Sequence, residues 1–212
     1  MARSIKRGEK TKSLSDLNQQ KTALRTEVKA RLKAMTPAER ATASQQATVR
    51  LEAQSHWREA KTILFYAPLP EELDVWPLLV DAIAARKTVL LPRFDAEQNH
   101  YVACQIKDAN GDVRTGRFGV REPLDSCVRI PLKRLDLILV PGIAFDLHGH
   151  RLGRGKGFYD RLLSVLEGPA CGVAFDQQIV SQIPVEPHDM RLSCILTPTR
   201  WQCENGPRAV LK

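Results

Sequence analysis

The chain has 212 residues, 43% of them hydrophobic, and a formal net charge of +8. This length suffices for one domain with a sizeable core. No apolar run reaches the about 18–20 residues that a membrane span requires. The basic N-terminus lacks the apolar segment of a secretory signal, and its acidic residues disfavour a transit peptide. We therefore expect a cytoplasmic protein, and the simplest interpretation of its five cysteines, which form no C-x-x-C pair, is reduced thiols.

Most of the positive charge lies near the N-terminus. Residues 1–33 contain ten Lys or Arg and three acidic residues, whereas the remaining chain contains 22 basic and 21 acidic residues. We expect residues 1–14 to be a basic, disordered tail, residues 15–202 to form one domain and residues 203–212 to be a C-terminal tail. The sequence contains no zinc finger, RNA-binding sheet motif or basic patch interleaved with aromatics, so no specific nucleic-acid partner is expected.

The N-terminal part of the domain is predicted to form two helices. In the first, from Ser13 to about Met35, apolar residues recur at the spacing of one helical face. They are Leu24, Val28, Leu32 and Met35. The segment Thr36-Pro37-Ala38-Glu39 has the features of a helix start, with a threonine N-cap, a proline in the first turn and a glutamate three residues after the cap. The second helix should end near Gln54.

Beyond residue 60, short apolar runs alternate with helical patterns. The predicted strands cover residues 61–67, 88–91, 101–106, 135–140, 170–175 and 192–196, and the predicted helices cover residues 74–86 and about 158–166. Continuously apolar runs such as residues 135–140 are typical of strands buried on both faces of a parallel sheet. We therefore predict an α/β fold of one domain, with three layers (α/β/α) and a mainly parallel sheet.

A basic, glycine-rich loop follows the strand predicted at residues 135–140. In residues 151–157, Arg-Leu-Gly-Arg-Gly-Lys-Gly, glycines alternate with cations. Glycine allows positive φ, consecutive backbone amides can form an anion-binding concavity, and a helix starting near Gly157 or Phe158 would point its N-terminus at the same place. The pattern is neither a P-loop nor a dinucleotide fingerprint, and a flexible surface loop is the alternative. Its position at the carboxyl end of a central strand favours a phosphate site.

Residues 141–163, PGIAFDLHGHRLGRGKGFYDRLL, resemble the signature of the 5-formyltetrahydrofolate cyclo-ligase family. Shorter matching segments occur in the family's order at residues 21–25, 66–72, 91–93, 119–123 and 187–190. Each short segment alone is weak evidence, whereas the long one is specific. The resemblance implies an enzyme that cyclises 5-formyltetrahydrofolate to 5,10-methenyltetrahydrofolate with ATP, and releases ADP and phosphate.

The resemblance implies an ATP site made of two segments. Lys21 and Arg25 fit the family's K-x-x-x-R element, which contacts ATP, and their side chains suit polyphosphate on chemical grounds. From the sequence alone they also fit a solvated helix face. The second segment comprises Arg151, Leu152, Gly153, Arg154, Gly155, Lys156, Gly157, Phe158 and Tyr159. We expect Arg154 and Lys156 to be catalytic, because phosphoryl transfer depends on positioning and charge stabilisation.

A folate site is implied just past the first predicted strand. The family's glutamate matches Glu72, although Glu71 is close to the same place. A carboxylate suits the pterin ring, which offers an amino group and a ring N–H as paired donors. Alternatively, these acids only favour the N-terminus of the following helix. The predicted substrate-binding residues are Ala67, Glu72, Phe118, Arg154 and Tyr159, with a plain core position as the alternative for Phe118.

By resemblance, Asp160 and Asp189 are Mg²⁺ ligands. The sequence alone favours a helix-dipole acid at Asp160, and only the resemblance reverses this preference. Two aspartates suffice chemically, because Mg²⁺ commonly combines one or two carboxylates with waters and substrate phosphates. The sequence shows no His/Cys cluster that would indicate zinc or iron.

The expected partners are therefore small molecules, ATP and a reduced folate, with no membrane and a monomeric chain. Two other classes of function remain open. One is a phosphosugar isomerase or acyl-CoA-type enzyme on a similar fold, against which Lys21, Arg25 and the two aspartates argue. The other is a non-catalytic protein that binds folate or nucleic acid through its basic arm, and deletion of residues 1–14 would separate it from an enzyme with an accessory tail.

Overall fold

A computed structural model describes residues 6–203 except 96, 98–99, 117–118, 132–134, 156, 166–167 and 187–188. For residues 6–14 and Phe158 it describes the backbone only. The helices are α1 (Lys6–Ala34), α2 (Pro37–Glu52), α3 (Ser55–Glu59), α4 (Trp76–Ala84) and α5 (Phe158–Val165), with a 3-10 helix, η2, at Asp176–Gln178. None of the described helices is long and apolar enough to cross a bilayer.

The described strands form one large sheet and two small hairpins. The large sheet has the order β12-β11-β10-β7-β1-β2-β3-β6. Its strands are β1 (Thr62–Leu64), β2 (Thr88–Asp95), β3 (His100–Ile106), β6 (Arg129–Ile130), β7 (Leu137–Val140), β10 (Ala170–Val173), β11 (Cys194–Leu196) and β12 (Trp201–Cys203). The five strands from β11 to β2 pair in parallel, and β12, β3 and β6 join antiparallel. The sheet is therefore mainly parallel, as predicted.

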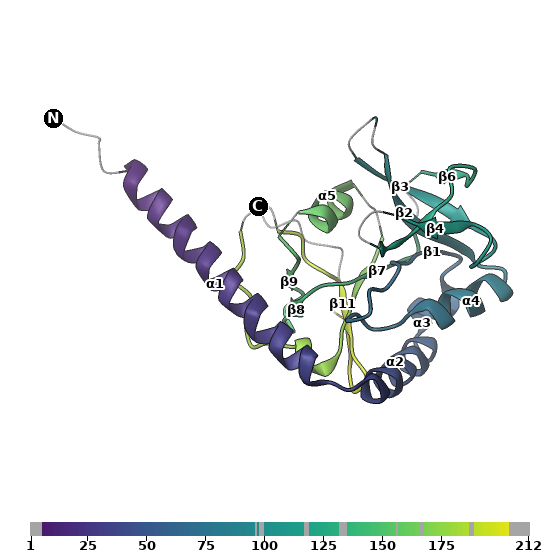
Figure 1. The fold of residues 1–212 in the computed structure, drawn as a ribbon, viewed down its shortest axis with the longest axis horizontal. Helices are drawn as coiled ribbons and strands as arrows, with labels where there is room; N and C mark the ends of the chain where they lie inside the picture. The colour runs from purple at the N-terminus through teal and green to yellow at the C-terminus, as the bar shows by residue number, and fades with distance from the viewer. Residues whose placement is uncertain are drawn as a thin grey trace.

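Two hydrophobic cores lie on opposite faces of this sheet, because successive strand residues point to opposite sides. Ile63 faces a core shared with Val28 and with residues of α2, α3 and α4, whereas Leu64 faces a core shared with Leu162 and Leu163 of α5. Figure 1 shows α2, α3 and α4 on one side of the sheet and α5 on the other. The predicted three-layer α/β/α arrangement is confirmed.

Helix α1 begins at Lys6, before the predicted start at Ser13, so residues 6–14 continue the helix. Figure 1 shows the N-terminal part of α1 extending away from the body of the protein. Val28 and Leu32, nearer its C-terminal end, are buried in the core. Thr36 then caps α2 with the predicted capping box, in which the Thr36 and Glu39 side chains each bond the other residue's backbone N–H.

Several short elements were not predicted. The hairpins β4 (Val113–Thr115) with β5 (Arg121–Pro123), and β8 (Ala144–Phe145) with β9 (Arg151–Leu152), lie in segments expected to be loops. Strand β12 lies at the edge of the sheet and ends at Cys203, the first residue of the predicted C-terminal tail.

The expectation of reduced thiols is wrong for two cysteines. Cys194 and Cys203 are directly opposite each other in the antiparallel pair β11–β12 and form a disulfide. Cys104, Cys127 and Cys171 are free. The strand register that brings Cys194 and Cys203 together could not be read from their spacing in the sequence.

Candidate active site

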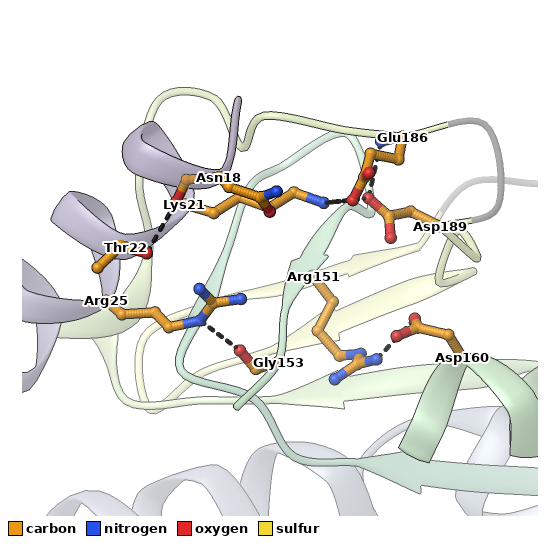
Figure 2. Close-up of polar contacts among 9 residues, drawn as sticks. All are labelled: Asn18, Lys21, Thr22, Arg25, Arg151, Gly153, Asp160, Glu186 and Asp189. Atoms are coloured by element: carbon orange, nitrogen blue, oxygen red, sulfur yellow. Dashed lines mark hydrogen bonds and ion pairs between the residues drawn. The ribbon is translucent and has the colours of Figure 1, made fainter. Parts of the chain in front are cut away.

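The segments predicted to bind ligands meet beyond the carboxyl ends of β1 and β7. Strand β7 leads through the β8–β9 hairpin to the basic loop at 153–157, and α5 follows this loop directly. Strand β1 leads to Ala67 and then to Glu71 and Glu72. Helix α1 contributes Lys21 and Arg25 from the N-terminal part of the chain, so residues far apart in sequence form one site (Figure 2).

Two glycines of the basic loop have the positive φ that their residue type permits. The φ angles are +91° at Gly155 and +60° at Gly157. Arg25 also lies against the loop. Its Nε donates to the carbonyl oxygen of Gly153 at 2.9 Å, and its Nη2 lies 3.6 Å from where a Cβ on Gly155 would be. The loop backbone is therefore held by α1 in a conformation that larger residues rarely adopt.

Lys21 is a nearly buried cation held by two carboxylates. Its Nζ lies 2.7 Å from Oε2 of Glu186 and 2.9 Å from Oδ2 of Asp189. Burial opposes the charged ammonium, but hydrogen bonds to the two carboxylates outweigh this effect and raise the pKa of Lys21. Asp189 also accepts the backbone N–H of Glu186 at 2.8 Å, so both acids are fixed in one turn.

Arg151 is predicted to lie in a loop but is the first residue of β9, and its side chain is only 4% exposed. Its Nη2 donates to Oδ1 of Asp160 at 2.8 Å, and its guanidinium lies 5.5 Å from the Tyr159 ring centroid. The buried Nε of Arg151 has no hydrogen-bond partner among the described residues. Since buried donors are nearly always bonded, this N–H is suited to an oxygen of a bound ligand.

Arg154 bridges the basic loop to the acids after β1. One of its Nη atoms lies 2.8 Å from Glu71 and 3.1 Å from Glu72. The Glu71 side chain is 46% exposed and that of Glu72 is 11% exposed. Burial raises the pKa of Glu72, although the Leu69 backbone N–H and Arg154 oppose it. Burial favours a higher pKa for Glu71 as well, but the hydrogen bond from Arg154 outweighs this effect, so the pKa of Glu71 is lowered. Of the two acids, Glu72 is the one enclosed by the protein.

Tyr159 lies near Glu72, and Ala67 lies in the segment between β1 and Glu72. Ala67 is buried in the core on the α1 side of the sheet. Tyr159 is partly buried and contacts both cores. Burial, followed by the charge of Glu72, raises the pKa of its hydroxyl well above the usual range, so the phenol stays protonated and can donate a hydrogen bond.

One residue predicted to bind ATP is buried, and others are not among the residues that the structure describes. Leu152 is buried in the core, and its carbonyl accepts the Ile143 N–H. Lys156 and Phe118 are not among the described residues. Phe158 begins α5, but its side chain is not described.

Two acidic residues of this region were missed in the sequence. Glu186 and Asp189 both form an ion pair with Lys21. In the sequence, the only indication of this role is that Glu186 is a second acid three residues before Asp189. Asp146 is completely buried, and its carboxylate accepts the backbone N–H groups of His148, His150 and Ile183, and contacts the His150 ring. Asp146 therefore fixes the turn before β9. In the sequence, the only indication of this role is an acid placed between a short apolar run and a His-Gly-His segment.

The donor set fits Mg²⁺. Asp160 and Asp189 offer carboxylate oxygens, the ligands this ion prefers in proteins. Each is bonded to a cation predicted to bind phosphate, Asp160 to Arg151 and Asp189 to Lys21 (Figure 2). Their side chains are 23% and 17% exposed, so both are accessible to a ligand.

The fold and the site place the chain in the class of α/β proteins with a mainly parallel sheet, which bind ligands outside the carboxyl ends of their strands. In this chain, paired cations and acids lie there. Within this class, a model of the 5-formyltetrahydrofolate cyclo-ligase family matches residues 17–198. The chain therefore belongs to the 5-formyltetrahydrofolate cyclo-ligase family, a family of ligases.

Individual relatives agree. The 5-formyltetrahydrofolate cyclo-ligase of Mus musculus is 30% identical over 191 residues, which cover 85% of this chain and 94% of that protein. The protein of the same name from Escherichia coli strain K12 is 32% identical over 180 residues, covering 82% of this chain and 99% of that one.

The fold is also that of solved structures. The structure of Aquifex aeolicus 5,10-methenyltetrahydrofolate synthetase superposes with a TM-score of 0.79 at 30% identity, covering 89% of this chain and 95% of that one. A 5,10-methenyltetrahydrofolate synthetase from Mycoplasma pneumoniae gives a TM-score of 0.67 at 22% identity, with coverage of 84% and 98%, and supports the fold alone.

Proposed function

We propose that this protein catalyses the ATP- and Mg²⁺-dependent cyclisation of 5-formyltetrahydrofolate to 5,10-methenyltetrahydrofolate, with release of ADP and phosphate. The observation that carries the proposal, beside family membership, is the pairing of Lys21 with Asp189 and of Arg151 with Asp160. In each pair a cation suited to polyphosphate holds a carboxylate suited to Mg²⁺. Binding of Mg²⁺ with ATP would give both members of each pair a new partner of opposite charge.

ATP binding is assigned to the residues around the basic loop. Lys21, Arg25 and Arg151 supply positive charge from α1 and β9, and the unpartnered Nε of Arg151 is one donor ready for an oxygen. The loop leads directly into the N-terminus of α5, a place where anions are favoured. When bound, Mg²⁺ would neutralise charge on the phosphates, and Asp160 and Asp189 are the residues that would hold it.

The reduced folate is assigned to Ala67, Glu72 and Tyr159, with Phe118 as a further candidate. Glu72 is enclosed and offers a carboxylate to the paired donors of the pterin ring. Arg154 touches Glu72 and belongs to the phosphate-binding loop. It therefore links the position of the folate to that of the phosphoryl group.

The chemistry requires activation of a poor leaving group. The oxygen of the formyl group carried by N5 attacks the γ-phosphorus of ATP. The bond between this phosphorus and the β,γ-bridging oxygen breaks, and ADP leaves. N10 then attacks the formyl carbon, loses its proton, and the carbon–oxygen bond breaks to release phosphate. Every bond forms between substrate atoms, so the protein needs to align them and stabilise charge, for which Arg154 and Lys156 are the proposed residues.

We further propose that the protein acts in the cytoplasm as a monomer. Among the described residues, the large hydrophobic side chains that are exposed are all valines, whereas subunit interfaces are enriched in aromatic residues and methionine.

The direct test is a mixture of purified protein, ATP, Mg²⁺ and 5-formyltetrahydrofolate, followed by the near-ultraviolet absorbance of the methenyl bridge. The proposal predicts an increase that requires both ATP and the metal, shown by omitting ATP and by chelation. A folded protein that binds ATP but gives no increase would refute the proposed reaction and indicate another substrate for the same phosphate site.

A further inference from the structure

Three potential metal ligands meet away from the candidate active site. They are His56 on α3, Cys194, the first residue of β11, and Cys203, the last residue of β12. One ligand atom from each lies within 4.8 Å of the other two. Cys194 begins a strand that is parallel to β7, so the cluster is at the amino ends of the sheet strands, whereas the candidate active site follows their carboxyl ends.

The spacing between His56 and Cys203 suits two ligands of a tetrahedral zinc ion. Zinc binds cysteine sulfur at about 2.3 Å and histidine nitrogen at about 2.0–2.1 Å, which places two such ligands roughly 3.6 Å apart. The Sγ of Cys203 and the Nε2 of His56 are 3.6 Å apart. The same geometry requires roughly 3.8 Å between two sulfurs, so the disulfide must be reduced before both cysteines can bind one ion.

The donor set also separates this cluster from the Mg²⁺ site. Two thiolates and an imidazole are soft or borderline ligands that select Zn²⁺ or Cu⁺ over Mg²⁺. Cys194 is buried, and His56 and Cys203 are partly buried beside Trp201, whose ring centroid lies 5.5 Å from that of His56. The site is thus shielded but reachable by an ion.

We propose that the reduced protein binds one Zn²⁺ through His56, Cys194 and Cys203, with the fourth position open to water. The disulfide and the zinc site are then alternative states of one cluster. Two electrons and two protons convert the disulfide into two thiols. Zinc binding releases these two protons, because the ligands are thiolates. In either state the cluster ties the edge strand β12 to β11, and zinc additionally ties both strands to α3.

The wild-type protein provides the first test. The disulfide is reduced anaerobically by a trialkylphosphine, which becomes a phosphine oxide with oxygen from water, and the excess is removed. Zinc is then titrated and cysteine alkylation is mapped by mass spectrometry. We expect one equivalent of zinc to be bound and to slow the alkylation of Cys194 and Cys203 but not of Cys127. Equal alkylation of Cys194 and Cys203 with and without zinc would overturn the proposal.

Variants then separate a metal site from a simple disulfide. His56→Ala leaves both cysteines in place and should weaken zinc binding by about 100-fold or more, since loss of even a second-shell partner costs about 10–100-fold. Cys203→Ser should weaken Co²⁺ binding and, at saturating Co²⁺, leave at most about half of the thiolate-to-cobalt charge-transfer intensity, because only the Cys194 thiolate remains. His100→Ala and Cys127→Ser are the matched controls and should bind normally. Binding that survives His56→Ala unchanged would contradict the assignment.

Discussion

Lys21 on α1 and Asp189 in the turn before β11 are 168 positions apart in the chain, yet their Nζ and Oδ2 atoms lie 2.9 Å apart. Glu186 is bonded to the same ammonium at 2.7 Å. Through these contacts the N-terminal helix is joined to the acid predicted to hold Mg²⁺. Under the proposed function, Lys21 has two roles, one toward these carboxylates in the free protein and one toward ATP.

Lys21→Met should weaken ATP binding roughly tenfold or more, because a hydrogen bond to a charged group contributes about 1.5–3 kcal/mol. It should also destabilise the free protein, since two largely shielded carboxylates lose their cation. Calorimetric titration with ATP and denaturant unfolding measure the two effects. Lys29→Met, at an exposed position of the same helix, is the control. Unchanged ATP affinity in Lys21→Met would remove this residue from the site.

Lys156→Ala should lose turnover far more than folding stability. Removal of one group that stabilises transition-state charge typically lowers the rate by about 10²–10³-fold, whereas a loop lysine contributes little to the core. Single-turnover kinetics and a thermal unfolding curve for the same sample provide the comparison, with the exposed Lys33→Ala as control. The assignment fails if the variant unfolds but keeps full activity per folded molecule.

Glu72→Gln should raise the KM for 5-formyltetrahydrofolate about tenfold, the loss expected for a charged hydrogen bond, with a smaller effect on the KM for ATP. Glu71→Gln is the matched control, because both residues contact Arg154 but Glu71 is far more exposed. It should change either constant by less than about threefold, as surface ion pairs contribute only about 0–1 kcal/mol. If Glu71→Gln alone weakened folate binding, the folate ligand would be Glu71.

Thr36→Ala should lower the free energy of unfolding by about 1 kcal/mol, the usual effect of losing an N-cap, and leave turnover per folded molecule unchanged. The Thr36 hydroxyl accepts the Glu39 N–H, and the Glu39 carboxylate accepts from the backbone and side chain of Thr36. These bonds lower the pKa of Glu39. Its stabilising contribution is therefore present above its unfolded pKa and is lost as the pH falls through the lower folded value.

Denaturant unfolding between neutral and acidic pH checks this prediction. The stability difference between wild type and Thr36→Ala should shrink as the pH falls, whereas Thr36→Ser, which keeps the hydroxyl, should follow the wild type. A difference that stays constant with pH would show that the capping box contributes no pH dependence.

The sequence contained enough information for the main architecture. Apolar runs such as Leu137–Val140 predict buried parallel strands because they need apolar residues on both faces. The threonine cap of α2 and the start of α5 at Phe158 follow from local residue chemistry. These features depend on neighbours in the chain, which a sequence displays directly.

What the sequence did not reveal depends on pairing between distant segments. Arg151 was expected in an open loop, but the hairpin β8–β9 places it in a strand and against Asp160. Glu186 and the contact of Cys203 with His56 likewise result from tertiary register. The sequence alone therefore indicated no soft-metal cluster, although the fold assembles three suitable ligands.

The most direct test of the account follows the formyl oxygen itself. 5-Formyltetrahydrofolate labelled with ¹⁸O at the formyl group is converted with unlabelled ATP and Mg²⁺ in unlabelled water, and the released phosphate is analysed by mass spectrometry. Phosphorylation of the formyl oxygen predicts one ¹⁸O atom in the phosphate for each methenyl group formed. Methenyl formation with unlabelled phosphate would contradict the phosphorylated intermediate, and absence of methenyl formation by a folded, ATP-binding protein would contradict the function itself.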